Sequence, residues 1–108
     1  MVKALVLDAG ILGLLTNPKR SDTGEACGKW LQSAIINDYQ IIVPEITDYE
    51  IRRELLRANK LNGLQRLDNF ISSNAVTYLP IDTAVMRQAA LLWAEARQQG
   101  DLLPITKL

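Results

Sequence analysis

The hydrophobic positions of the first half of the chain change their period several times, and each change predicts a different element. A short, continuous apolar run at residues 4–7 stops at Asp8. This pattern is typical of a fully buried strand, and we expect that strand to be central in its sheet. A brief helical turn is expected over residues 11–15, and the proline that follows closely is expected to end it. Apolar residues then recur at helical spacing over residues 24–37, which predicts an amphipathic helix, and residues 40–43 form the next predicted strand.

The second half of the chain repeats this alternation. Residues 45–59 are helical by propensity, and the Asn62-Gly63 pair is expected to end that helix. A short helix over residues 64–72 and a strand over residues 75–79 follow, and the longest helix is expected over residues 83–99. Strands that alternate with helices predict an α/β domain with a parallel sheet, because a crossover helix is how parallel strands are joined.

Composition narrows the classes of protein that this chain can belong to. The 108 residues match one domain, and twelve basic side chains balance twelve acidic ones, so any contact with nucleic acid must come from a local patch. No histidine is present and Cys27 is the single cysteine, which excludes a Cys/His zinc site and an internal disulfide. We expect Cys27 to be a buried structural thiol. The sequence contains no recognisable signal peptide and no apolar stretch of membrane-spanning length, so a soluble, cytoplasmic protein is expected.

Asp8 is the first candidate for chemistry. It directly follows a predicted strand, and ligands of open α/β sheets bind beyond the carboxyl ends of strands. The alternative is that Asp8 caps the helix that begins near Ile11, because aspartate is a favoured N-cap residue. A phosphoryl-transfer site with a second acid two residues later is not favoured, since Gly10 stands there, and a phosphoacceptor module would need neighbouring acids that are missing.

Glu50 is the second candidate, and local helix stabilisation competes with a functional role. Thr47 and Glu50 have the spacing of a capping box, in which Thr47 would cap the helix. Glu50 also lies three residues before Arg53, the spacing of a weak surface ion pair. Asp82 follows a predicted strand as Asp8 does, but it also precedes a long helix, so capping is a sufficient explanation for Asp82.

Two segments together resemble a known family. Residues 7–18, Leu-Asp-Ala-Gly-Ile-Leu-Gly-Leu-Leu-Thr-Asn-Pro, are similar to the opening of PIN-domain proteins of the VapC toxin-like kind, in which an aspartate ends the first strand. Residues 44–57 are similar to the segment that supplies the second acid of these proteins, here Glu50. The resemblance extends to about residue 100. It implies a three-layer α/β/α fold with a short parallel sheet, as a single partial domain over residues 1–108 that lacks the C-terminal elements of the family.

The chemistry implied by the resemblance is metal-dependent hydrolysis of RNA phosphodiester bonds. Asp8 and Glu50 would hold Mg²⁺ or Mn²⁺, or Glu50 would orient the attacking water. The basic residues Arg52, Arg53 and Arg57 would contact RNA phosphates, although an ordinary solvated helix face explains them equally well. A toxin-like ribonuclease also implies an antitoxin protein as partner.

The end of the sequence departs from the family pattern and keeps a second interpretation open. Residues 101–108 do not match the family's next acidic segment, Asp-x-x-Ile-Ala-Ala, so only two acids of the metal site are matched and weak metal binding is expected. The alternative to a ribonuclease is therefore an inactive PIN remnant that serves as a binding or dimerisation module. A homodimer is expected in both cases, because a shortened sheet exposes apolar surface and residues 101–108 are themselves rich in apolar side chains.

Overall fold

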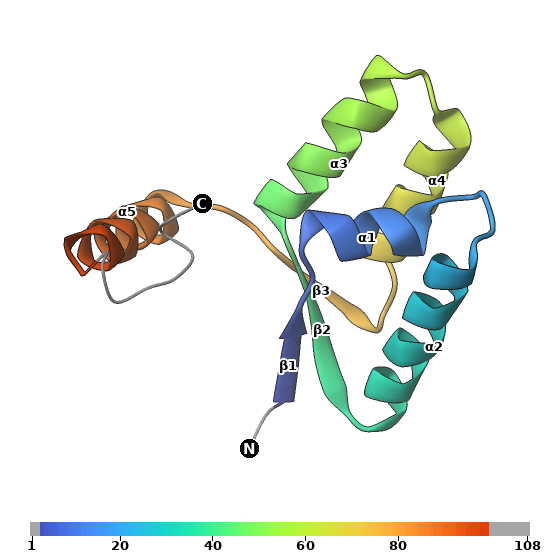
Figure 1. Ribbon diagram of the computed structural model, residues 1–108, viewed down its shortest axis with the longest axis horizontal. Helices are drawn as coiled ribbons and strands as arrows, with labels where there is room; N and C mark the ends of the chain where they lie inside the picture. The colour runs from blue at the N-terminus through green and yellow to red at the C-terminus, as the bar shows by residue number, and fades with distance from the viewer. Residues whose placement is uncertain (1–2, 100–108) are drawn as a thin grey trace.

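Three parallel strands form the sheet of the computed structural model, which describes residues 3–99 (Figure 1). The strands are β1 (Lys3–Val6), β2 (Tyr39–Pro44) and β3 (Val76–Leu79), in the order β1-β2-β3. Lys3 pairs with Tyr39 in the first ladder, and Ile41 pairs with Val76 in the second. The predicted α/β class with a short parallel sheet is confirmed.

Four helices form the two crossovers between these strands. The first crossover contains α1 (Ala9–Thr16) and α2 (Asp22–Ile36), and the second contains α3 (Glu45–Arg57) and α4 (Leu61–Ile71). Both crossovers run across the sheet in the same direction. Because such connections are right-handed, they place their helices on the same face of the sheet.

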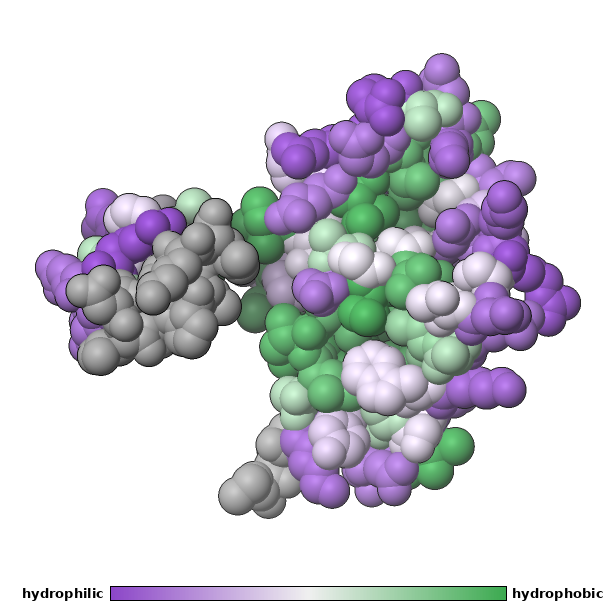
Figure 2. All heavy atoms as spheres, in the orientation of Figure 1, coloured by the Kyte–Doolittle hydropathy of each residue, from purple (hydrophilic) through white to green (hydrophobic). Residues whose placement is uncertain are grey.

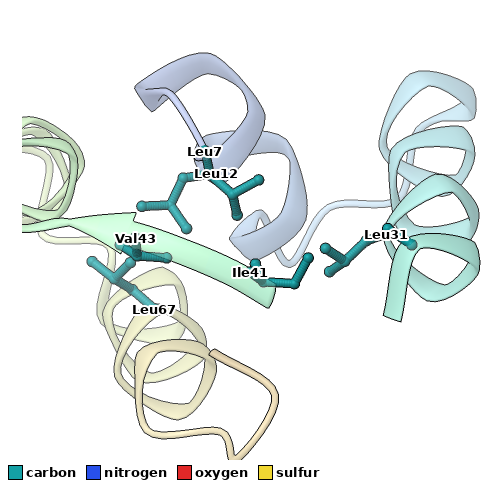
Figure 3. Close-up of a cluster of buried hydrophobic side chains, with 7 residues drawn as sticks. Leu7, Leu12, Leu31, Ile41, Val43 and Leu67 are labelled. Carbon is teal, nitrogen blue, oxygen red and sulfur yellow. The ribbon is translucent and has the colours of Figure 1, made fainter. Parts of the chain in front are cut away.

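The core lies between that face and the helices (Figure 3). Ile41 and Val43 of β2 are fully buried, whereas Gln40 and Ile42, which alternate with them, are not. Burying one aliphatic side chain of this size contributes roughly 1.5–3 kcal/mol. Within residues 3–99, the buried apolar residues of this core are Leu7, Leu12, Leu31, Ala34, Ile41, Val43 and Leu67.

The prediction that the first strand is central is wrong for the described sheet. β2 is the middle strand, and β1 pairs with it along one side only. Val6 of β1 is 64% exposed, and its register partner Ile42 faces the same side of the sheet. An apolar run reports that a strand carries hydrophobic side chains, but it does not report whether both of its edges are paired.

The predicted boundary between the third and fourth helices is also wrong. The third helix already ends at Arg57, because Asn59 adopts a left-handed backbone with φ 54°. The amide of Lys60 then donates to the carbonyl of Leu55 at 2.9 Å, which closes the helix. Gly63 instead lies inside α4, where a Cβ atom would stand 2.7 Å from a methyl carbon of Leu55. This glycine therefore permits a close approach of α3 and α4 and does not end a helix.

The last described helix, α5 (Thr83–Gln98), stands apart from the rest of the structure (Figure 1). The side chain of Asp82 accepts a hydrogen bond from the amide of Val85 at 2.8 Å, so its predicted capping role is confirmed. No residue of α5 is buried. The radius of gyration is 16.0 Å, compared with about 13 Å for a compact domain of this length. The predictions for residues 100–108 lie outside the described residues.

Candidate metal and nucleic-acid site

Asp8 lies where β1 passes into α1, at the carboxyl end of the strand. Its Oδ1 atom accepts a hydrogen bond from the amide of Ile11 at 2.9 Å, so Asp8 is the N-cap of α1 as predicted. The residue is exposed. Capping uses one carboxylate oxygen in this contact, and a solvent-facing carboxylate can still bind a ligand through its second oxygen.

A hydrogen bond from Thr47, in the first turn of α3, reaches this strand end. The hydroxyl of Thr47 is buried and donates to the carbonyl of Leu7 at 3.3 Å. The predicted capping role of Thr47 is wrong, because α3 begins two residues earlier and Pro44 is its N-cap without any side-chain hydrogen bond. The hydroxyl instead fixes the first turn of α3 against the residue that precedes Asp8.

Glu50 follows Thr47 by about one helical turn, on a neighbouring part of the same helix surface. Its side chain is exposed, and within the described residues it makes no hydrogen bond or ion pair. The predicted surface pair with Arg53 is not formed, since the Arg53 guanidinium stacks on the ring of Tyr49 at 5.3 Å. The Thr47 hydrogen bond therefore places the helix of Glu50 beside the strand end that carries Asp8.

Close packing between α1 and α3 supports this arrangement. A Cβ atom at Gly13 would lie 3.3 Å from the Cδ1 atom of Ile51, so the two helices approach each other closely at this glycine. Within residues 3–99, however, no group of three or more cysteine or acidic side chains is placed to hold a metal ion. The described part of the chain places the segments of Asp8 and Glu50 side by side and holds no complete acidic cluster.

A second, buried carboxylate on α3 was missed by the sequence analysis. Asp48 accepts a hydrogen bond from the hydroxyl of Tyr78 at 2.8 Å and another from Nε of Arg52 at 3.1 Å. Arg52 also bonds Asp68 on α4 at 2.7 Å. Burial, followed by the hydrogen bond and charge of Asp48, raises the pKa of Tyr78 to about 12. These contacts join α3 to β3 and α4, so we assign Asp48 a structural role.

The three arginines predicted to contact RNA lie in three different environments. Arg52 is held between Asp48 and Asp68, as described above. Arg57 pairs with Glu54 at 2.9 Å on the exposed surface of α3. Arg57 also lines a cavity of about 420 Å³ between α1 and α3, together with Lys19 and Lys60. Arg53 lies on the exposed surface of α3 over the ring of Tyr49, so the exposed basic side chains near α1 and α3 are Arg53, Arg57 and these two lysines.

Cys27 lies on α2 and is half-buried, not fully buried as predicted. Burial raises the pKa of its thiol, and the negative charge of Asp8 raises it further. α1, which Asp8 caps, packs on α2, so the thiol lies on a helix that neighbours the candidate site. Sequence spacing gave no indication of this packing.

Comparison with known proteins adds one finding to this geometry. The family model for the PIN domain matches residues 5–105, nearly the whole chain. No curated protein and no solved structure matches the chain significantly. Among the described helices, none is long and apolar enough to cross a membrane. PIN domains are generally nucleases that act on RNA and typically use divalent metal ions. Because the family model covers nearly the whole chain and the described residues form a parallel α/β fold, this chain belongs to the PIN-domain family.

Proposed function

We propose that this PIN domain is a divalent-metal-dependent endoribonuclease of the VapC toxin-like kind, with Asp8 and Glu50 as metal ligands. The observation that carries the proposal is the contact from Thr47 to the carbonyl of Leu7, which brings the helix of Glu50 to the strand end of Asp8. An antitoxin protein and a second copy of the chain are the protein partners of this proposal.

The two carboxylates fit a hard divalent cation. Mg²⁺ and Mn²⁺ prefer oxygen ligands, and both side chains are exposed enough to reach an ion in solution. Asp8 would bind through the oxygen that does not cap α1, and Glu50 would bind directly or orient a water. When bound, the ion would supply an activated water and neutralise charge on a phosphate. Thr47 would act as a positioning residue for both carboxylates.

RNA binding is proposed for the basic side chains beside α1 and α3. Lys19, Arg57 and Lys60 line one cavity, and this grouping supports contacts with successive phosphates of a single strand. Arg53 lies on the surface of the same helix and adds a planar guanidinium. Arg52 is less available to RNA, because Asp48 and Asp68 already bind its guanidinium.

The second candidate function is an inactive PIN domain that serves as a binding or dimerisation module. It is favoured by one observation: the described residues contain no third carboxylate close enough to complete a metal-binding group. Two carboxylates hold a divalent ion weakly, because all-oxygen sites gain affinity from the number and charge of their ligands.

Cleavage of a fluorescent single-stranded RNA in the presence of Mn²⁺ separates the two candidates. Asp8→Asn and Glu50→Gln are the test variants, and Asp82→Asn is the matched control, because Asp82 also follows a strand and caps a helix. Asparagine is itself a good N-cap, so the aspartate changes should leave stability nearly unchanged. We expect cleavage by the wild type and by the control, and a loss of at least about tenfold in both test variants.

Two results would decide against the ribonuclease. The first is a wild type that does not cleave RNA at any Mn²⁺ concentration, which favours the inactive module. The second is cleavage that survives in Asp8→Asn at the rate of Asp82→Asn, which shows that the activity belongs to other residues or to a contaminating nuclease. Titration of Mn²⁺ into the same proteins measures the metal affinity independently of cleavage.

A further inference from the structure

We propose that α5 of one copy packs on the open sheet face of a second copy, so that two chains exchange this helix reciprocally. The open face is defined here by Val6, Ile42, Thr77 and Leu79, which point away from the face covered by α1 to α4. This inference deepens the homodimer of the proposed function and does not depend on catalysis.

The open face carries exposed apolar side chains beside one polar pair, in which Nε2 of Gln40 donates to Oγ1 of Thr77 at 3.0 Å. Val6 and Ile42 are register partners, and Ile42 and Thr77 are partners in the next ladder, so these three side chains lie side by side across all three strands. Val6 and Leu79 are both about half exposed or more. Two residues at the start of α3, Ile46 and Tyr49, are exposed as well. Figure 2 shows apolar atoms on the part of the molecule formed by the sheet and α1 to α4, on the side that faces α5. Soluble proteins seldom leave such a surface uncovered.

α5 carries the complementary surface. Helical periodicity places Val85, Ala89 and Leu92 beside Met86 and Trp93 on one face of the helix. All four of the large side chains in this set are exposed. An apolar helix face of this kind normally packs on a sheet or on another helix.

The handedness of the crossovers explains why α5 fits this face and not the one already covered. After β3 the chain has used the helical face for both earlier connections. A connection that returns across the sheet in the opposite direction must, if right-handed, cross over the open face. α5 follows β3 in the sequence and carries an apolar face. These are the features expected of the helix that covers the open face.

The linker before α5 favours a second copy over the helix's own sheet. Only Pro80, Ile81 and Asp82 separate β3 from α5, and the proline ring fixes one backbone angle. The amide of Ile81 donates to the Oε1 atom of Glu45 at 2.9 Å, so the linker is bound to the first residue of α3. α5 of the same chain lies away from its own sheet (Figure 1), so its apolar face and the open face are both left for a second copy.

The exposed apolar area approaches that of a standard dimer interface. A large apolar side chain that is about half exposed presents on the order of 90 Å². Eight such residues, four on α5 and four on the open face and the start of α3, therefore offer roughly 700 Å² per copy. A standard stable interface buries about 800 Å² per partner. These residues are Val85, Met86, Leu92, Trp93, Val6, Leu79, Ile46 and Tyr49.

Sedimentation of two matched variants tests the helix face. Leu91 and Leu92 are adjacent and similarly exposed, at 52% and 56%, but Leu91 lies outside the apolar face of α5. We expect the wild type to be a dimer at micromolar concentration. Because the interface contains α5 twice, Leu92→Glu should raise the dissociation constant at least about a hundredfold, and Leu91→Glu should change it less than about fivefold. Far-UV circular dichroism of both variants verifies that the helices persist.

Cross-linking identifies the occupant of the open face. In a Cys27→Ser background, one chain carries Val6→Cys and a second chain, made longer by a tag, carries Leu92→Cys. A short bis-maleimide should join the two chains of different length. As a comparison, a single chain carries both cysteines, and cross-links formed only within that chain would overturn the exchange. A monomeric wild type, or equal effects of the two leucine changes, would overturn it as well. RNA cleavage by such a monomer would leave the ribonuclease proposal intact, so the two proposals fail separately.

Discussion

Asp48→Ala tests whether the buried contacts of α3 hold the helix that carries Glu50. The Asp48 side chain is only 11% exposed, and the change removes its hydrogen bonds to Tyr78 and Arg52. A hydrogen bond to a charged group contributes about 1.5–3 kcal/mol, but Arg52 keeps its second partner Asp68. We therefore expect a loss of about 2–4 kcal/mol in the free energy of unfolding, a large part of the roughly 5–15 kcal/mol typical of a small domain.

Asp68→Ala is the matched control for this change. Asp68 binds the same guanidinium at 2.7 Å, but its side chain is 58% exposed, and exposed ion pairs contribute about 0–1 kcal/mol. Urea denaturation followed by circular dichroism gives both values. A double-mutant cycle of Asp48→Ala with Tyr78→Phe should give a coupling energy of at least about 1 kcal/mol. A stabilising role for Asp48 is refuted if Asp48→Ala lies within about 0.5 kcal/mol of the wild type or if the two aspartate changes are equally destabilising.

Three further changes test single contacts. Thr47→Val deletes the hydroxyl that donates to the carbonyl of Leu7, so stability should fall by about 1 kcal/mol and calorimetry should show weaker Mn²⁺ binding; unchanged binding would remove Thr47 from the site. The pKa of Tyr78 is raised from 10.0 to about 12, mainly by burial, so the unfolded chain loses this proton first. Stability should therefore be retained below pH 10 and fall as the pH rises from 10 to 12, more steeply than in Tyr78→Phe, as urea titrations at each pH would measure. Burial and then the charge of Asp8 raise the pKa of Cys27, so Asp8→Asn should accelerate alkylation of this thiol by iodoacetamide at pH 8, and an equal or slower rate would contradict their proximity.

The sequence predicts which elements form because their period is local, and it fails where the outcome depends on neighbours. The sequence predicted β2 to within one residue from its apolar run, and the start of the following helix from helix propensity. It placed β1 in the centre of the sheet because the same apolar run suits a strand with one paired edge or with two. The end of α3 was misplaced for a different reason: Asn59 took the left-handed position, which glycine usually occupies, while Gly63 was needed for its lack of a side chain.

The candidate site was predictable as two residues but not as an arrangement. Asp8 and Glu50 were identified from their segments, and Asp8 was also recognised as a cap. The role of Thr47 was not recognisable, because its partner Leu7 lies far away in the sequence. The same holds for Asp48 and Tyr78, whose contact joins α3 to β3. Only the i, i+4 spacing of Asp48 and Arg52 was visible beforehand, and such spacing is common on solvated helices.

The pairing of the sheet has a consequence for the rate at which the chain folds. Lys3 pairs with Tyr39 and Ile41 pairs with Val76, so every ladder joins partners about 35 residues apart in the sequence. Neither ladder can close until a two-helix crossover has formed and returned the chain to the sheet, and the loop entropy is lost before the strand contacts compensate for it. β2 takes part in both ladders, so a nascent chain that has not yet reached residue 79 holds β2 with one edge unpaired. We expect folding in milliseconds to seconds and a yield that falls with protein concentration during refolding, because the unpaired edge of β2 is then open to other chains.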